Sequence, residues 1–197
     1  MGENTKPIDI EFCSKMEEDF IMDLLEIDSS VYDPSVLGSY DSVRSRYEAN
    51  RDSCILAFDG SKIVGYVAFF PISDNLSERM RVEDKSFDDD IKAADILPSY
   101  ESDKPYDVFL ISIAILPEYQ GKGIGTALMK RFFSFMYDKR NNGSNIRNIY
   151  TYAYTDGGAH VLGAEGFFVI KKLSLQEYPN IKFMRYSFQD KEEVIDA

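Results

Sequence analysis

The fold is decided by DVFLISIAILPEYQGKGIGTAL, residues 107–128. The first ten of these residues form an almost unbroken apolar run, which is typical of a strand buried on both faces. Pro117 closes the run, and glycines then alternate with other residues at 121, 123 and 125. Apolar residues on one helical face follow, at Ile124, Leu128, Phe132 and Phe135. The sequence therefore predicts a buried strand, a glycine-rich turn and a helix that begins near Gly123.

The glycines of this turn indicate that a ligand approaches the backbone closely. The first N–H groups of a helix have no partner within the helix, and the helix dipole is positive there, so the turn suits a phosphate or pyrophosphate. A Walker A loop is excluded, because Gly123 rather than Ser or Thr follows Lys122. A dinucleotide fingerprint is also excluded, because Thr126 stands where the third glycine is needed. A glycine-lined turn without a ligand is the remaining alternative.

Hydrophobic spacing and turn residues predict the other elements of the chain. In order, we expect a strand at 8–12, helices at 17–30 and 34–50, a hairpin of 54–58 and 62–70 that Pro71 ends, the strand at 107–116, the long helix, a strand at 147–154, a short helix at 156–165 and strands at 167–173 and 181–188. This order predicts a mixed α/β sheet with helices on its faces.

Composition limits the classes of function. The chain has 197 residues, 44% of them hydrophobic, which suits one globular domain over 1–197. The formal net charge of −12 argues against nucleic acid or an anionic membrane as a partner and is compatible with a cationic amine substrate. Cys13 and Cys54 lie far apart, and with one histidine, His160, they form no zinc site, so a reduced cytoplasmic setting without a metal is expected. We see neither a secretory leader nor an apolar run that could span a bilayer.

Residues 73–106 differ from the rest of the chain because acidic residues dominate them. Strongly apolar strands are predicted on both sides, so we interpret this segment as an insertion on the surface of the domain. A charged run of this kind is usually a solvated face. A lid over the substrate is the alternative, and Ile91, Ile96 and Leu97 indicate a short helix within the segment.

The loop resembles a known family. Gln120-Gly121-Lys122-Gly123-Ile124-Gly125 is similar to Arg/Gln-x-x-Gly-x-Gly/Ala, the acetyl-CoA signature of the GNAT superfamily of N-acyltransferases. The strand and turn of 113–119, and Ala159 with Gly166-Phe167, also resemble that family. The resemblance covers 8–188 and is strongest at 107–173. It implies a mixed, mostly antiparallel sheet of about seven strands with a V-shaped splay, flanked by about four helices.

The resemblance also implies a function and a site. The function would be transfer of an acetyl group from acetyl-CoA to a primary amine of a small molecule or protein. Homodimers are common in the family, so the resemblance also makes a homodimer an expectation. Loop N–H groups would hold the CoA pyrophosphate, the strand backbone would pair with the pantetheine arm, and Asp156 would touch that arm. The cofactor-binding residues implied are Ile113, Ala114, Ile115, Gln120, Gly121, Lys122, Gly123, Ile124, Gly125, Thr126 and Asp156.

The catalytic groups of the family are incomplete in this sequence. Many members carry a Glu on the strand and a Tyr four residues after the motif alanine, but here the strand has no carboxylate in its middle and Gly163 or Leu162 stands at the Tyr position. Ser112 and Tyr154 are the catalytic candidates, with Tyr152 and His160 as further acids. Two other functions therefore remain open: a catalytically silent module that binds CoA or a protein, and an unrelated phosphate-binding domain.

Overall fold

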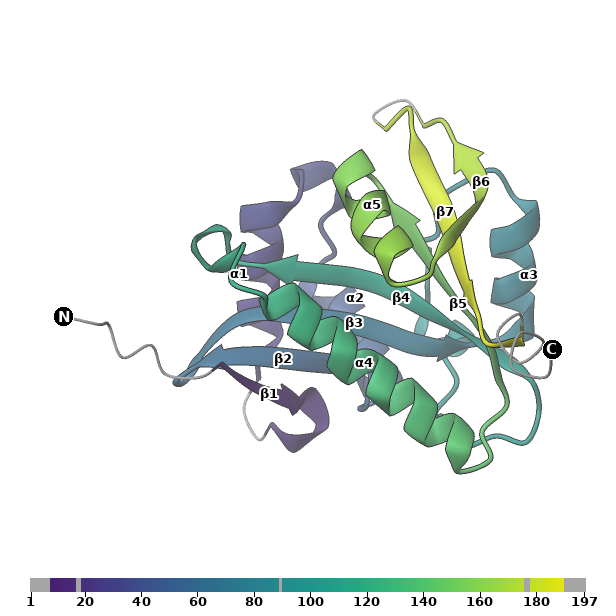
Figure 1. Ribbon diagram of the computed structural model, residues 1–197, viewed down its shortest axis with the longest axis horizontal. Coiled ribbons are helices and arrows are strands. Elements are labelled where there is room, and N and C mark those ends of the chain that lie inside the picture. Colours follow the sequence, from purple (N-terminus) through teal and green to yellow (C-terminus); the bar gives the residue numbers. More distant parts are fainter. Residues whose placement is uncertain (1–7, 17–18, 89, 176–177, 190–197) are drawn as a thin grey trace. The chain divides into compact units, whose positions relative to one another are not determined.

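The computed structural model describes residues 8–16, 19–88, 90–175 and 178–189. Its strands are β1 (Asp9–Phe12), β2 (Cys54–Asp59), β3 (Lys62–Ile72), β4 (Tyr106–Ile115), β5 (Ile146–Ala153), β6 (Phe168–Leu173) and β7 (Ile181–Ser187). Its α-helices are α1 (Ile21–Val31), α2 (Tyr40–Ala49), α3 (Asp74–Val82), α4 (Ile124–Asn141) and α5 (Asp156–Ala164) (Figure 1).

The seven strands form one mixed sheet in the order β1-β2-β3-β4-β5-β7-β6. The pairs β1–β2, β2–β3, β5–β7 and β6–β7 are antiparallel, whereas β4 and β5 are parallel. The mixed α/β class predicted from the order of the elements is confirmed. The contacts divide the chain into two compact units, one of 1–69 with 112–138 and one of 70–111 with 139–197.

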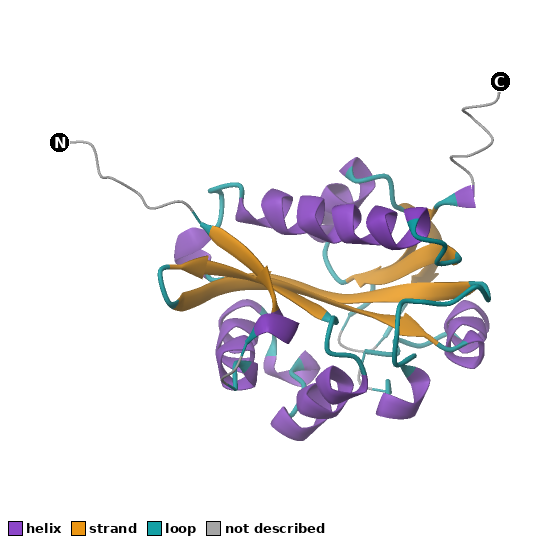
Figure 2. Ribbon diagram, turned by 90° about the horizontal axis from the view of Figure 1, so that it is seen from below, coloured by secondary structure: helices purple, strands orange, loops and turns teal. Residues whose placement is uncertain are grey.

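In the first unit, helices cover both faces of the strands. Phe69 of β3 packs against Phe132 of α4, with ring centroids 4.7 Å apart, and Phe12 of β1 packs against Phe135. Tyr66 lies three residues before Phe69 and so faces the other side of β3, where its hydroxyl meets Asp28 of α1. Figure 1 shows α4 in front of β2 and β3 with α1 and α2 behind them, and Figure 2 shows the long helix α4 above these strands.

In the second unit, β5 and β7 carry an aromatic core. The rings of Tyr150 and Tyr152 stack on Phe183 of β7, with centroids 5.3 Å and 4.8 Å away. A buried ionic network connects α3 to the strands. Asp107 of β4 accepts hydrogen bonds from Ser77 of α3 and from Arg147 and Asn148 of β5.

The acidic segment is less solvated than its composition suggests. Val82 is exposed, but most of its large apolar or aromatic side chains are buried, among them Leu76, Met80, Phe87, Ile91, Ile96 and Tyr100. The short helix expected around 91–97 is instead α3 at 74–82, capped by the Ser73 hydroxyl, and only a single 3-10 turn lies at Ala93–Asp95. With α3 there are five α-helices in the described ranges rather than the expected four.

Three expected boundaries were wrong for local reasons. The strand β3 continues through Pro71 to Ile72, because residues 95–97 pair with it there: Ile96 bridges Ile72, and the Pro71 carbonyl accepts the N–H of Leu97 at 2.8 Å. Proline is tolerated at such a strand end. The helix expected at 17–30 begins at Ile21, whose N–H is capped by the Asp19 carboxylate; residues 17–18 lie outside the described residues. The helix expected at 34–50 begins at Tyr40, because Ser39 caps it.

Candidate functional site

The glycine loop joins the end of β4 to the start of α4 in the first unit. Gly121 and Gly123 have φ angles of 73° and 81°, a region that favours glycine. A Cβ at either position would find no heavy atom within 4 Å. The Gly123 carbonyl accepts the N–H of Ala127, so α4 begins where the sequence predicts. The first N–H groups of an 18-residue helix therefore lie beside open space on the glycine side.

The side chains of the loop turn back toward the protein. Gln120 Nε2 donates to the Ile115 carbonyl at 3.0 Å, and the Gln120 N–H donates to Pro117 at 3.2 Å. The Lys122 ammonium lies 4.7 Å from the centre of the Tyr119 ring. The loop N–H groups that remain for an anion are those from Gly121 onward, because the Gln120 N–H is already used within the turn.

The last residues of β4 have unusual neighbours on both sides. The pairing of β4 with β5 runs from Tyr106 to Phe109. Farther along, the Ile113 carbonyl accepts a hydrogen bond from the Tyr32 hydroxyl at 2.8 Å. On the β3 side, a Cβ at Gly65 would lie 3.0 Å from the Ala114 carbonyl oxygen, so glycine favours this close approach.

Ser112 belongs to a connected set of side chains that we call the hydroxyl chain, formed by Asp28, Tyr66, Ser112 and Tyr32. The Ser112 hydroxyl lies 3.1 Å from the hydroxyls of both tyrosines. Tyr66 donates to the Asp28 carboxylate, and Tyr32 donates to the Ile113 carbonyl. Tyr66 is buried, whereas the other three are half-buried. The hydroxyl chain thus connects the Asp28 carboxylate on α1 to Ser112 in the middle of β4.

The pKa of Asp28 is raised toward neutral pH. Burial raises the pKa of its carboxyl to about 6, and the hydrogen bond from Tyr66 opposes this shift. Burial and the Asp28 charge both raise the pKa of Tyr66 well above its usual value, so the phenol is protonated at pH 7. Asp28, Tyr32 and Tyr66 were not predicted as site residues, because they lie far apart in the sequence and carry no local motif.

Tyr154, Asp156 and His160 lie in the second unit. The Tyr154 hydroxyl lies 2.7 Å from Ser86 Oγ and donates to the Asp88 carboxylate, and both partners belong to the acidic segment. Asp156 forms an ion pair with Lys182 at 2.6 Å. Ser112 and Tyr154 therefore have separate sets of partners, one in each unit.

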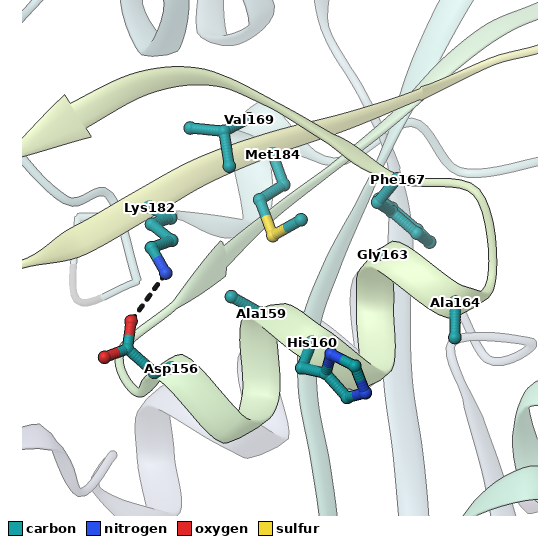
Figure 3. A pocket seen from close by; sticks show the side chains of 9 residues that line it. All are labelled: Asp156, Ala159, His160, Gly163, Ala164, Phe167, Val169, Lys182 and Met184. Carbon is teal, nitrogen blue, oxygen red and sulfur yellow. Dashed lines mark hydrogen bonds and ion pairs between the residues drawn. The ribbon is translucent and has the colours of Figure 1, made fainter.

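A pocket of about 560 Å³ lies between α5 and strands β6 and β7. Asp156 and Lys182 meet at one end of it, and His160 and Gly163 line its helical side (Figure 3). Its remaining lining is mainly apolar and includes Phe167 and Met184. Of the two residues that the sequence aligned with the missing Tyr, Gly163 is exposed on α5 and Leu162 is buried.

The described ranges of the chain contain no group of three His, Cys, Asp or Glu side chains that could hold a metal ion. No helix in these ranges is both long enough and apolar enough to cross a membrane.

A mixed sheet with a glycine turn before a long helix defines the class of fold, an α/β protein whose longest helix in the described ranges begins directly after a glycine-rich turn. Comparison with known proteins gives the family. The model described as "Acetyltransferase (GNAT) family" matches residues 19–147, and the chain belongs to this family. No curated protein matches the chain at the significance required.

Solved structures agree on the fold. Ard1 from Thermoplasma volcanium is 14% identical, covers 91% of this chain and 97% of its own, and has a TM-score of 0.62. A chain of the NatC complex bound to Gag peptide and CoA is 12% identical, with coverage of 93% and 99% and a TM-score of 0.65. Arabidopsis thaliana Naa50, in complex with the bisubstrate analogue CoA-Ac-MVNAL, is 15% identical, with coverage of 92% and 99% and a TM-score of 0.59. At these identities the likeness shows the fold alone.

Proposed function

We propose that this protein is an N-acetyltransferase that transfers the acetyl group of acetyl-CoA to a primary amine. The observation that carries the proposal is the turn before α4, where Gly121 and Gly123 have positive φ and leave open the space a side chain would fill. A pyrophosphate needs this close approach to N–H groups at a helix N-terminus. Family membership supports CoA as the molecule that carries this pyrophosphate.

The residues of the turn and of β4 are the ones that would hold CoA in this proposal. The N–H groups of Gly121, Lys122, Gly123, Ile124, Gly125 and Thr126 would hold the pyrophosphate. The backbone of Ile113 and Ile115 would hold the pantetheine arm as an added strand does, and an N–H of Ala114 or Ile115 would stabilise charge on the thioester oxygen. When bound, acetyl-CoA supplies the acetyl group as an activated thioester.

The acceptor ammonium must first lose one proton, to the protein or to water. The neutral amine then attacks the thioester: a C–N bond forms, the C–S bond breaks, and a second proton from the nitrogen goes to the CoA sulfur, which leaves as the thiol. The NatC and Naa50 structures were solved with a peptide and with a peptide-containing analogue, which supports a peptide N-terminus as one acceptor to be tested. The net charge of −12 supports a cationic acceptor in general.

Two measurements test the proposal. Calorimetry should show binding of CoA and no binding of ATP or NAD. Release of free CoA thiol from acetyl-CoA should then be followed across a panel of peptides, polyamines and arylalkylamines. Turnover with any acceptor supports the enzyme. Tight CoA binding with no turnover would favour a silent module, the alternative supported by the missing Tyr at position 162 or 163 and by the missing Glu on the strand. ATP or NAD binding without CoA binding would contradict both.

A further inference from the structure

The hydroxyl chain has a direction that follows from counting its protons. Each hydroxyl can donate only once. The Tyr66 proton is given to Asp28, and the Tyr32 proton is given to the Ile113 carbonyl. Ser112 Oγ lies 3.1 Å from both phenol oxygens, so its own proton is given to one of them. The oxygen of Ser112 therefore faces the next donor as an acceptor.

That next donor would be the substrate. Ser112 is half-buried and directly precedes Ile113–Ile115, the part of β4 proposed to hold the pantetheine arm. This inference rests on the proposed function, since it assigns a role within the same site. We propose that the acceptor ammonium donates to Ser112 Oγ and that its proton is passed through Tyr66 to Asp28, the terminal proton acceptor.

The protons gained and lost along the hydroxyl chain balance. The ammonium gives one proton to Ser112 Oγ, Ser112 gives its own proton to Tyr66, and Tyr66 gives its own proton to Asp28. The amine becomes neutral, the two hydroxyls keep their protonation states, and the carboxylate becomes a carboxylic acid. Tyr32 stands beside this route and not on it, because its proton is given to the Ile113 carbonyl.

The surroundings of Asp28 suit a proton acceptor that works near neutral pH. Among the described residues, Tyr66 on β3 donates to Asp28, and Cys54 on β2 lies close enough for the Asp28 charge to act on it. Burial raises the pKa of the Cys54 thiol, and the Asp28 charge adds to this, so the thiol is neutral at pH 7. Both neighbours are therefore neutral at pH 7, and the Tyr66 hydrogen bond only partly offsets the effect of burial on Asp28. A base with a pKa near the working pH is the most effective.

Three substitutions interrupt the proton route along the hydroxyl chain at different residues: Asp28→Asn, Tyr66→Phe and Ser112→Ala. Each should leave CoA affinity unchanged by calorimetry and should lower kcat/KM by about 100-fold at pH 7. Tyr32→Phe should cost less than tenfold, because it leaves the route intact. Asp23→Asn, an exposed carboxylate on the same helix, is the matched control and should behave as the wild type.

The pH profile separates proton transfer from a loss of structure. Wild-type kcat/KM should fall below pH 6 as Asp28 becomes protonated, and the Asp28→Asn variant should lack this fall at its lower rate. Rates within threefold of wild type for Asp28→Asn and Ser112→Ala, with the acidic limb kept, would overturn the inference and leave the proposed function standing. If Asp28→Asn does not fold, Tyr66→Phe and Ser112→Ala decide in the same way. A wild-type protein that acetylates no amine would instead overturn the proposed function, and this inference with it.

Discussion

At the scale of single residues, the two glycines with positive φ before α4 give the clearest test of the CoA loop. Gly123→Val is expected to weaken CoA binding, but a β-branched residue at a φ of 81° is also strained. Gly123→Ala is therefore the sharper variant. Its methyl group would enter the space proposed for the pyrophosphate, and we expect CoA affinity to fall by tenfold or more, measured by calorimetry.

Gly60 in the β2–β3 turn provides the matched control. Its φ is 64°, and a Cβ there would also meet no atom within 4 Å. Gly60→Ala and Gly123→Ala should each cost about 1–2 kcal/mol of stability, because both force a side chain into the left-handed region. Only Gly123→Ala should change CoA affinity. Equal affinities for the two variants would show that the pyrophosphate lies elsewhere.

Gly163 in α5 is a residue whose replacement should stabilise the protein. It lies inside the helix with no positive φ, and a Cβ there would meet no heavy atom within 4 Å. Gly163→Ala should raise the free energy of unfolding by about 0.5–1 kcal/mol, because glycine has low helix propensity. Thermal melts should show a higher Tm, whereas Gly143→Ala, at a φ of 98°, should lower it. A lower Tm for Gly163→Ala would mean that the helix interior is crowded there.

At the scale of elements, the network around Asp107 should control the attachment of α3. The Asp107 side chain is only 2% exposed, and Arg147 binds it at 2.9 Å while also binding Asp74 at 2.6 Å. Asp107→Asn leaves Arg147 without its buried counter-charge and should cost about 3 kcal/mol in urea unfolding. Asp74→Asn should cost less than about 1 kcal/mol, because that side chain is 75% exposed. Similar losses in the two variants would contradict a dominant role for the buried carboxylate.

Elements with a strong local pattern were predictable, and those held by distant contacts were not. The apolar run predicted both ends of β4 within a residue, and the helical spacing with the glycine turn predicted the start of α4 within a residue. The helix α3 was missed, because its buried residues, among them Leu76 and Met80, stand within a charged segment. The loop glycines could be found from their spacing alone.

The hydroxyl chain could not be found in this way. Ser112 lies 46 positions from Tyr66 and 80 from Tyr32, and Tyr66 lies 38 from Asp28. Such separations leave no periodic pattern in the sequence. Ser112 itself was predicted as a site residue because it is the one polar side chain in the middle of an apolar strand. Its partners became visible only when the sheet brought them together.

At the scale of the whole molecule, Asp28 should make the free energy of unfolding depend on pH. Its pKa is about 6 in the folded protein and near 3.8 in the unfolded chain. Between these values the folded state binds a proton that the unfolded state does not, so the free energy of unfolding should fall as pH rises from about 4 to about 6. Above pH 6 the full cost remains, at most about 3 kcal/mol, and solvent around the half-buried carboxylate reduces it.

Asp28→Asn removes the titration and keeps an oxygen that can accept the Tyr66 hydroxyl proton. We therefore expect this variant to be more stable than the wild type at pH 7.5 by about 1–2 kcal/mol and nearly equal to it at pH 4. Other carboxylates of this acidic chain, such as Asp19 and Glu83, have lowered pKa values and contribute slopes of the opposite sign. Urea titrations at several pH values should thus be read as the difference between the wild type and the variant, with Asp23→Asn as the control. If the difference in free energy of unfolding between the variant and the wild type does not grow between pH 4 and pH 6, Asp28 titrates normally. The expected growth would mean that the protein keeps, at neutral pH, a charged carboxylate that destabilises its fold.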